Sequence, residues 1–371
     1  MQGKIQIFVL AVLCFTPTLV NVPQAILYGL ISLIGLIVLV QKIVHKKLSK
    51  SDYVLFSFLL LSFIIFFAGD GLRESTTGKS KNDLVPYTLF IVTTIFFARS
   101  LHEDVLKFVF YFILFEIIIG VLEYIFGVPY LIKPLSESQT EFGSTDILYY
   151  NKVYGISAVT SVFSQKVLIG LILLFYLNIV KYRKIYLGLL LIGLLITFNR
   201  TAIVTSLFFL ALLFRKSFKK LGIKYKAILI ICLLSFLFLT YLNIEIILFQ
   251  FFRGSGDIDY SGRDYVFVSF IDFISNNFFF GNFAQKVWIE LGGRTYHAHN
   301  SYLETLASLG FILTLIFVFY LFKIITRKKM IFLLPILLYS TFQFGIFWGV
   351  SLLDIVFFFL IFSNTKSAKE T

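Results

Sequence analysis

Residues 292–311, GGRTYHAHNSYLETLASLGF, gather side chains that could do chemistry immediately before an apolar run. They include His297 and His299, which are two of the four histidines in the chain, together with Arg294 and Asn300. Imidazole can serve as a general base near neutral pH, and guanidinium binds phosphate with two parallel hydrogen bonds. The stretch therefore predicts a site for an anionic substrate beside a group that can take a proton.

The same stretch also predicts where a helix begins. Ser301 and Glu304 have the S-x-x-E spacing of a capping box, so Ser301 is the expected N-cap. His297 and His299 would then precede a helix N-terminus, whose partial positive charge disfavours imidazolium and attracts anions. A neutral histidine here could act as a base, and His299 is our choice. A pair of interfacial histidines without chemistry and a His-x-His metal site are the alternatives, although no third metal ligand is evident nearby.

Two arginines elsewhere in the chain could hold an anion. Arg200 interrupts an apolar stretch between the basic segments KYRK and RKSFKK, which predicts a hairpin of two short spans with Arg200 at its tip. Arg263 lies between Gly262 and Asp264 in a long polar segment. An arginine in a turn bonded to lipid phosphate is the alternative for Arg200, and a surface ion pair with Asp264 is the alternative for Arg263.

Acidic residues also fall inside apolar blocks. Glu116 lies in the middle of a block, Glu123 lies nearer its end, and Asp354 lies in the last block. Charges at membrane depth are costly and therefore need partners. We expect Glu116 and Glu123 to pair with neighbouring helices and Asp354 to have a structural role, in preference to catalytic roles.

The composition predicts an all-α polytopic membrane protein. Mean hydropathy is +0.91 and only 14% of residues are charged, which leaves too little polar surface for a soluble globule. The apolar residues form blocks near the roughly 20 residues that cross a bilayer as helix. Cys14 and Cys232 lie in such blocks, so no disulfide framework is expected. The N-terminus has a single lysine, Lys4, and no A-x-A cleavage site, which favours a retained first helix.

About twelve spans are predicted, and residues 1–371 are expected to form a single integral membrane domain. Long outer loops are expected at 127–161 and 243–300. The second loop carries the site residues and includes apolar residues at helical spacing that predict a helix at the membrane surface, namely Val266, Phe270, Phe273, Ile274 and Phe278. The predicted spans are 5–20, 24–40, 52–68, 84–98, 105–126, 162–180, 185–198, 201–214, 226–242, 301–322, 331–347 and 350–363.

The charges predict the orientation of these spans. With both termini in the cytoplasm, the inside segments hold most of the 33 Lys and Arg residues, as the positive-inside rule requires. The net charge of +13 is therefore mainly a topology signal and a preference for anionic membrane lipids. Nucleic acid is not an expected partner.

In their order along the chain, these features resemble the O-antigen ligase and polymerase superfamily of bacterial surface polysaccharide assembly. The resemblance rests on TFNRTAIV around Arg200, SGRDYVF around Arg263, NNFFFGNF, and HAHNSYLETLASLGF. KVYGISAVTSVFSQ also resembles a segment of the family, although Lys152 stands where the family often has arginine.

The resemblance implies a GT-C-type glycosyltransferase that needs no metal or cofactor. Such an enzyme takes a glycan from an undecaprenyl diphosphate donor on the outer face of the bacterial inner (plasma) membrane and transfers it to an acceptor hydroxyl. Arg200, Arg263 and Lys152 would hold the diphosphate. His299 would be the general base. The residues expected to contact substrate are His297, Asn300 and Arg294.

The resemblance leaves the acceptor open. A polymerase that joins lipid-linked repeat units into O-antigen or capsule is our first hypothesis, and a ligase that transfers the chain to lipid A–core is the alternative. A chain-length regulator would be a further partner of a polymerase. A flippase would instead predict inverted repeats and short loops. An enzyme related to the peptidoglycan polymerases would use an acidic residue of the outer loop, of which Asp257, Asp259 and Asp264 are the candidates.

Overall fold

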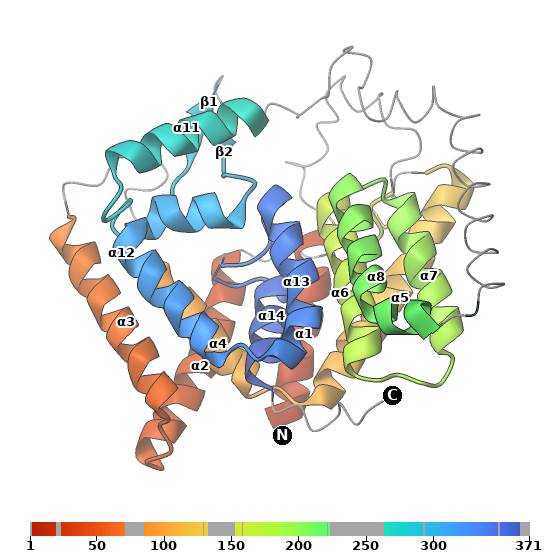
Figure 1. Cartoon of the computed structure of the whole chain (residues 1–371), viewed down its shortest axis with the longest axis horizontal. Helices are drawn as coiled ribbons and strands as arrows, with labels where there is room; N and C mark the ends of the chain where they lie inside the picture. The colour runs from red at the N-terminus through yellow and green to blue at the C-terminus, as the bar shows by residue number, and fades with distance from the viewer. Residues whose placement is uncertain are drawn as a thin grey trace.

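The computed structural model describes residues 2–19, 24–70, 85–128, 130–132, 153–157, 159–220, 222, 263–291, 294–347 and 349–363. These residues form helices and one two-stranded hairpin (Figure 1). The elements are α1 (Gln2–Leu19), α2 (Gln24–Val44), α3 (Lys50–Ala68), α4 (Thr88–Arg99), α5 (Glu103–Phe126), α6 (Thr160–Tyr176), α7 (Arg183–Ile196), α8 (Arg200–Lys220), α11 (Arg263–Asn276), β1 (Ile289–Leu291), β2 (Arg294–Tyr296), α12 (Ser301–Ile324), α13 (Arg327–Phe342) and α14 (Leu352–Phe362).

The predicted helical architecture is confirmed for the described residues. Each predicted span except 226–242, which lies outside them, falls on a helix, and the helix predicted in the second loop is α11. Among the residues that the structure describes, four helices are long and apolar enough to cross a membrane, namely Ile26–Val44 within α2, α3, α5 and α12. Shorter apolar helices include α4, α6 and α14. The count of twelve spans and the two long outer loops remain predictions, and Cys232 and the side chain of Cys14 lie outside the described part.

The most buried helices are also among the shortest. In α14 every side chain from Leu352 to Ile361 is buried, and in α4 the same holds from Ile91 to Ala98. A helix that is apolar on all sides must be enclosed by other helices. Figure 1 shows both helices in the middle, with α3 and α12 on one side and α5, α6, α7 and α8 on the other.

Two of the predicted intramembrane acids accept hydrogen bonds from side chains. Glu116 accepts hydrogen bonds from Lys166 Nζ at 3.0 Å and from Ser157 Oγ at 2.6 Å, which connects α5 to α6 and to residues 153–157. Asp354 accepts one from Ser351 Oγ at 3.0 Å at the start of α14. Glu116 thus links two helices, whereas the Ser351 partner of Asp354 is the N-cap of the same helix, and both carboxylates have structural roles.

Glu123 holds two separate segments of backbone. Its carboxylate accepts the backbone N–H groups of Leu131 at 3.1 Å, Tyr154 at 3.0 Å and Gly155 at 2.8 Å. Leu131 follows α5, whereas Tyr154 and Gly155 precede α6. One buried side chain therefore joins the two ends of the segment that separates these helices.

α12 is not the continuous span that the sequence predicted. Gly310 has φ 68° and ψ 177°, which is outside the helical region and interrupts the helical hydrogen bonds. The turn at 277–284 supplies replacements: Phe311 N–H donates to Phe278 O at 2.8 Å, and Asn282 N–H donates to Ala307 O at 2.8 Å. A broken helix at membrane depth is tolerated only when its backbone groups are satisfied in this way.

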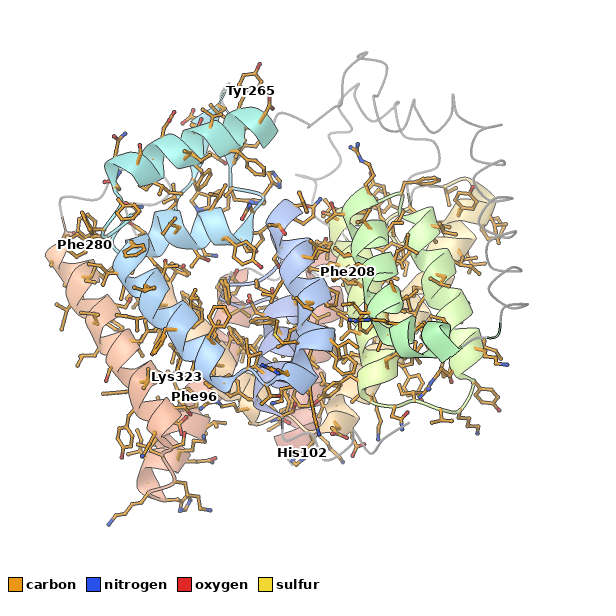
Figure 2. All side chains as sticks on the ribbon, viewed as in Figure 1. Phe96, His102, Phe208, Tyr265, Phe280 and Lys323 are labelled. Atoms are coloured by element: carbon orange, nitrogen blue, oxygen red, sulfur yellow. The ribbon has the colours of Figure 1, made fainter. Side chains whose placement is uncertain are left out.

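Two glycines permit this close approach. A Cβ on Gly281 would lie 2.4 Å from Gly310 N, and a Cβ on Gly310 would lie 2.4 Å from Phe279 O. Figure 1 shows the result: the first part of α12 lies beneath α11, and its second part runs beside α3. Figure 2 places Phe280, in this turn, near one end of α3.

Candidate functional site

The two histidines lie where the β-hairpin leads into α12. β1 and β2 pair antiparallel, with Ile289 opposite Tyr296, and residues 297–300 then connect β2 to α12. α11 covers this region (Figure 1). Its apolar face packs on the hairpin and on the first turns of α12, in a small core that includes Val266, Phe270, Phe273, Ile274, Val287, Ile289, Ala298 and Ala307.

Asn300, and not Ser301, is the N-cap of α12. Its side-chain oxygen accepts the backbone N–H groups of Tyr302 at 2.9 Å and Leu303 at 3.1 Å. The prediction of Ser301 was wrong because asparagine caps a helix at least as well as serine, and the chain begins its helix one residue earlier. The side-chain oxygen of Asn300 is therefore used to cap the helix. A contact between Asn300 and substrate remains a prediction.

Ser301 has a different role, which the sequence did not reveal. Its hydroxyl is buried and accepts the backbone N–H groups of Gly345 at 3.0 Å and Ile346 at 3.1 Å. These residues belong to the connection between α13 and α14. The beginning of α12 is therefore fixed to the last two helices.

Glu304 also departs from the capping-box prediction. Its Oε2 accepts the backbone N–H of Ala298 at 3.0 Å, three residues before the expected partner, Ser301. The side chain is only 3% exposed. The carboxylate therefore holds the residue between the two histidines in place.

His297 makes contacts that fix its ring and its tautomer. The ring packs edge-on against Phe344 at 5.1 Å and Trp288 at 6.2 Å between centroids. Its Nδ1 accepts the backbone N–H of His299 at 3.1 Å. Because an accepting nitrogen carries no proton, this contact favours the tautomer of His297 with its hydrogen on Nε2.

His299 lies against this ring in a restricted backbone conformation. The two imidazole centroids are 4.1 Å apart, and the rings are tilted by 47°. His299 has φ 50°, a left-handed conformation that is uncommon for residues other than glycine. Two imidazoliums this close would repel each other, so the pair disfavours double protonation. The role of His299 as the general base remains a prediction.

Arg200 lies at the predicted tip of a helical hairpin. α7 ends at Ile196 and α8 begins at Arg200, and the Asn199 side chain accepts the backbone N–H of Ala202 at 3.0 Å. The two helices with a turn before Arg200 are therefore confirmed, whereas their crossing of the membrane as short spans and the outer position of the tip remain predictions. Arg200 is half-buried, and its turn lies at the same end of the molecule as α11 and the β-hairpin (Figure 1).

The side chains of the other predicted cations are not among those that the structure describes. Arg263 is the first residue of α11 and Arg294 the first residue of β2, but the side chains of both lie outside the described residues, as does Lys152. The structure therefore brings together His297, His299 and Asn300. Among the described residues, no cluster of three or more His, Cys, Asp or Glu side chains could hold a metal ion.

Comparison with known proteins adds the family. Residues 185–318 match the family model described as O-antigen ligase. Over this segment, the chain is similar to the O-antigen ligase family. The match supports membership of the O-antigen ligase and polymerase superfamily, while no curated protein and no solved structure matches the chain.

The O-antigen ligase segment contains most of the candidate site. It begins in α7 and ends in α12, so it includes the turn at Arg200, the whole of α11, the hairpin and both histidines, whereas Lys152 precedes it. Together with the apolar helices, the match indicates a multi-pass membrane protein and an enzyme of the ligase or polymerase type.

Proposed function

We propose that the protein is a GT-C-type glycosyltransferase that polymerises undecaprenyl diphosphate-linked oligosaccharide repeat units. The product would be O-antigen or capsular polysaccharide, made on the outer face of the bacterial inner (plasma) membrane. The observation that carries the proposal is the O-antigen ligase match, because it spans both the arginine hairpin and the histidine pair. The pair adds a physical reason, since it combines a hydrogen-bond donor with a proton acceptor.

The reaction exchanges one C–O bond for another. The acceptor hydroxyl oxygen attacks the anomeric carbon of the donor glycan, the bond from that carbon to the diphosphate breaks, and the hydroxyl proton passes to His299. In-line attack inverts the anomeric centre. The departing diphosphate gains negative charge, which Arg200, Arg263 and Lys152 would stabilise as fixed cations without a metal ion.

His297 has a separate part in this scheme. Its Nδ1 accepts the His299 backbone N–H at 3.1 Å, and its proposed role is to donate a hydrogen bond from Nε2. Such a donor suits a phosphate or sugar oxygen and does not compete with His299 for the proton. Asn300 would contact the substrate from the same connection, and Arg294 from the start of β2.

A ligase is the second candidate, because the matching family is described by that activity. A ligase would use the same donor and the same base, but would transfer the finished glycan to lipid A–core. The two activities therefore differ in the acceptor and share the chemistry.

The experiment is reconstitution of the purified protein with its undecaprenyl diphosphate-linked repeat unit. We expect polymer from the wild type, and none from His299→Ala or Arg263→Ala. Glu290→Ala is the matched control, because Glu290 is an exposed carboxylate in the same hairpin. Normal polymer from both site variants would contradict the proposal.

A second arm decides between the two activities. Presented with lipid A–core and preformed lipid-linked polymer, a ligase attaches the polymer, whereas a polymerase leaves it unattached and extends repeat units. Movement of lipid-linked substrate across the membrane with no new glycosidic bond would point to a flippase.

A further inference from the structure

We infer that Glu304 is a positioning residue that holds the His297–His299 connection in its active geometry through a backbone hydrogen bond. The inference rests on the proposed function, because it assigns a role in the reaction to a residue that does not contact substrate. The capping-box pattern predicted that Glu304 accepts the backbone N–H of Ser301, whereas it accepts that of Ala298.

The first observation is where the carboxylate lies relative to the hairpin. Ile289 pairs with Tyr296, so Val287 and Ala298 occupy the corresponding position two residues further on, just beyond the last ladder pair. Ala298 N–H donates to Glu304 Oε2 at 3.0 Å, and the Val287 backbone also interacts with this carboxylate. Glu304 thus joins both strands at the point where their own pairing ends.

The second observation is that this bond lies between the two histidines. Ala298 is completely buried, His297 precedes it, and His299 follows it in a left-handed conformation. A left-handed backbone in a residue with a side chain persists only when its surroundings fix it. Glu304 fixes the middle residue, and the His299 N–H bond to His297 Nδ1 at 3.1 Å fixes the rings relative to each other.

The third observation is that burial of the Glu304 carboxylate costs free energy. A carboxylate that is 3% exposed is expensive unless it is hydrogen-bonded, and Lys286 lies close enough to interact with it electrostatically. A leucine at this position would fill similar space without that cost. The acceptor oxygen Oε2, which Glu304 presents to Ala298, gives a physical reason for a carboxylate at this position.

The test compares Glu304→Gln with Glu304→Leu in the full-length protein. Glutamine keeps an acceptor oxygen for Ala298, whereas leucine keeps the approximate volume and removes the acceptor. For Glu304→Leu we expect kcat to fall by about 100-fold, with the KM for the lipid-linked donor changed less than threefold, because misplacement of a catalytic group by about 1 Å costs rate on this order. Glu304→Gln should stay within about tenfold of the wild type.

A structural measurement runs alongside the kinetics. Hydrogen exchange measured by mass spectrometry should show faster exchange in peptides containing Ala298 for Glu304→Leu, and near wild-type exchange for Glu304→Gln. Glu290→Leu makes the same replacement at an exposed position of the same hairpin and should leave both exchange and kcat unchanged.

Several results would overturn the inference. They are a wild-type kcat for Glu304→Leu, a loss confined to KM, or a loss of kcat in Glu304→Gln equal to that in Glu304→Leu. His299→Ala separates this inference from the proposed function. If His299→Ala is inactive and Glu304→Leu is fully active, only the role of Glu304 fails; if His299→Ala is fully active, the proposed function fails first.

Discussion

At the residue scale, the two histidines differ because of one hydrogen bond. The His299 N–H occupies His297 Nδ1 at 3.1 Å, so the two imidazoles are not equivalent although they lie 4.1 Å apart. The sequence placed both at a helix N-terminus and had no means of distinguishing their tautomers, because a tautomer depends on the partner of each ring nitrogen.

This difference predicts distinct kinetics for two substitutions. His299→Ala should lower kcat by about 10²–10⁴-fold, because the general base is removed. It should also abolish the rise of rate with pH that follows deprotonation of that base. His297→Asn keeps an acceptor near the Nδ1 position, so it should reduce kcat less and retain the rise. The measurement is kcat as a function of pH for both variants; the opposite pattern would make His297 the base.

The buried acids give a second prediction at this scale. Glu116→Ala leaves Lys166 without its carboxylate in the protein interior, and breaking a buried pair costs about 3–5 kcal/mol. Lys107→Ala removes an exposed pair with Asp104, which should have a much smaller effect because solvent screens the two charges. Thermal unfolding in detergent compares the two. Equal effects would show that burial of the Glu116 pair does not matter.

At the scale of elements, the turn at 277–284 and the break in α12 depend on each other. The apolar run after Ser301 predicted a helix correctly, but not its interruption at Gly310. An isolated glycine in an apolar helix is compatible with an unbroken helix, and the interruption becomes favourable only because a distant turn replaces the lost hydrogen bonds. Sequence periodicity carries no information about that turn.

Gly310→Ala should therefore destabilise the protein. Its φ of 68° and a Cβ contact of 2.4 Å with Phe279 O both oppose a side chain, at a cost of about 1–3 kcal/mol or more. Gly188→Ala is the control, because a Cβ there meets nothing within 4 Å in α7. Replacement of a helical glycine by alanine should be neutral or stabilising by about 0.5–1 kcal/mol. Thermal unfolding followed by circular dichroism measures both variants, and equal melting temperatures would contradict the role of Gly310.

At the scale of the whole molecule, the helices and their order follow from the sequence more directly than the site does. Apolar blocks predicted helices because lipid leaves the backbone no other partner. The Arg200 hairpin was also predictable, from two basic segments and an apolar stretch too long for one span. The hydrogen bonds of Ser301 and Glu304 were not, because their partners come from the connection after α13 and from residues before the helix.

The orientation of the whole molecule in the membrane can be tested by cysteine labelling. Tyr265 lies on α11 and Lys323 near the end of α12, toward opposite ends of the molecule (Figure 2). In a variant without Cys14 and Cys232, a cysteine replacing exposed Tyr265 should react with an impermeant maleimide in intact cells. A cysteine replacing Lys323 should react only after the membrane is permeabilised. The reverse pattern would invert the topology and place the histidines inside.

The most direct test of the central claim is the stoichiometry of the reaction in a reconstituted membrane. Purified protein and lipid-linked repeat unit should yield one released undecaprenyl diphosphate for each new glycosidic bond, at an undiminished rate in the presence of a metal chelator. His299→Ala should bind the donor and form neither product. Bond formation by His299→Ala at the wild-type rate, or consumption of donor without a matching glycosidic bond, would contradict the account.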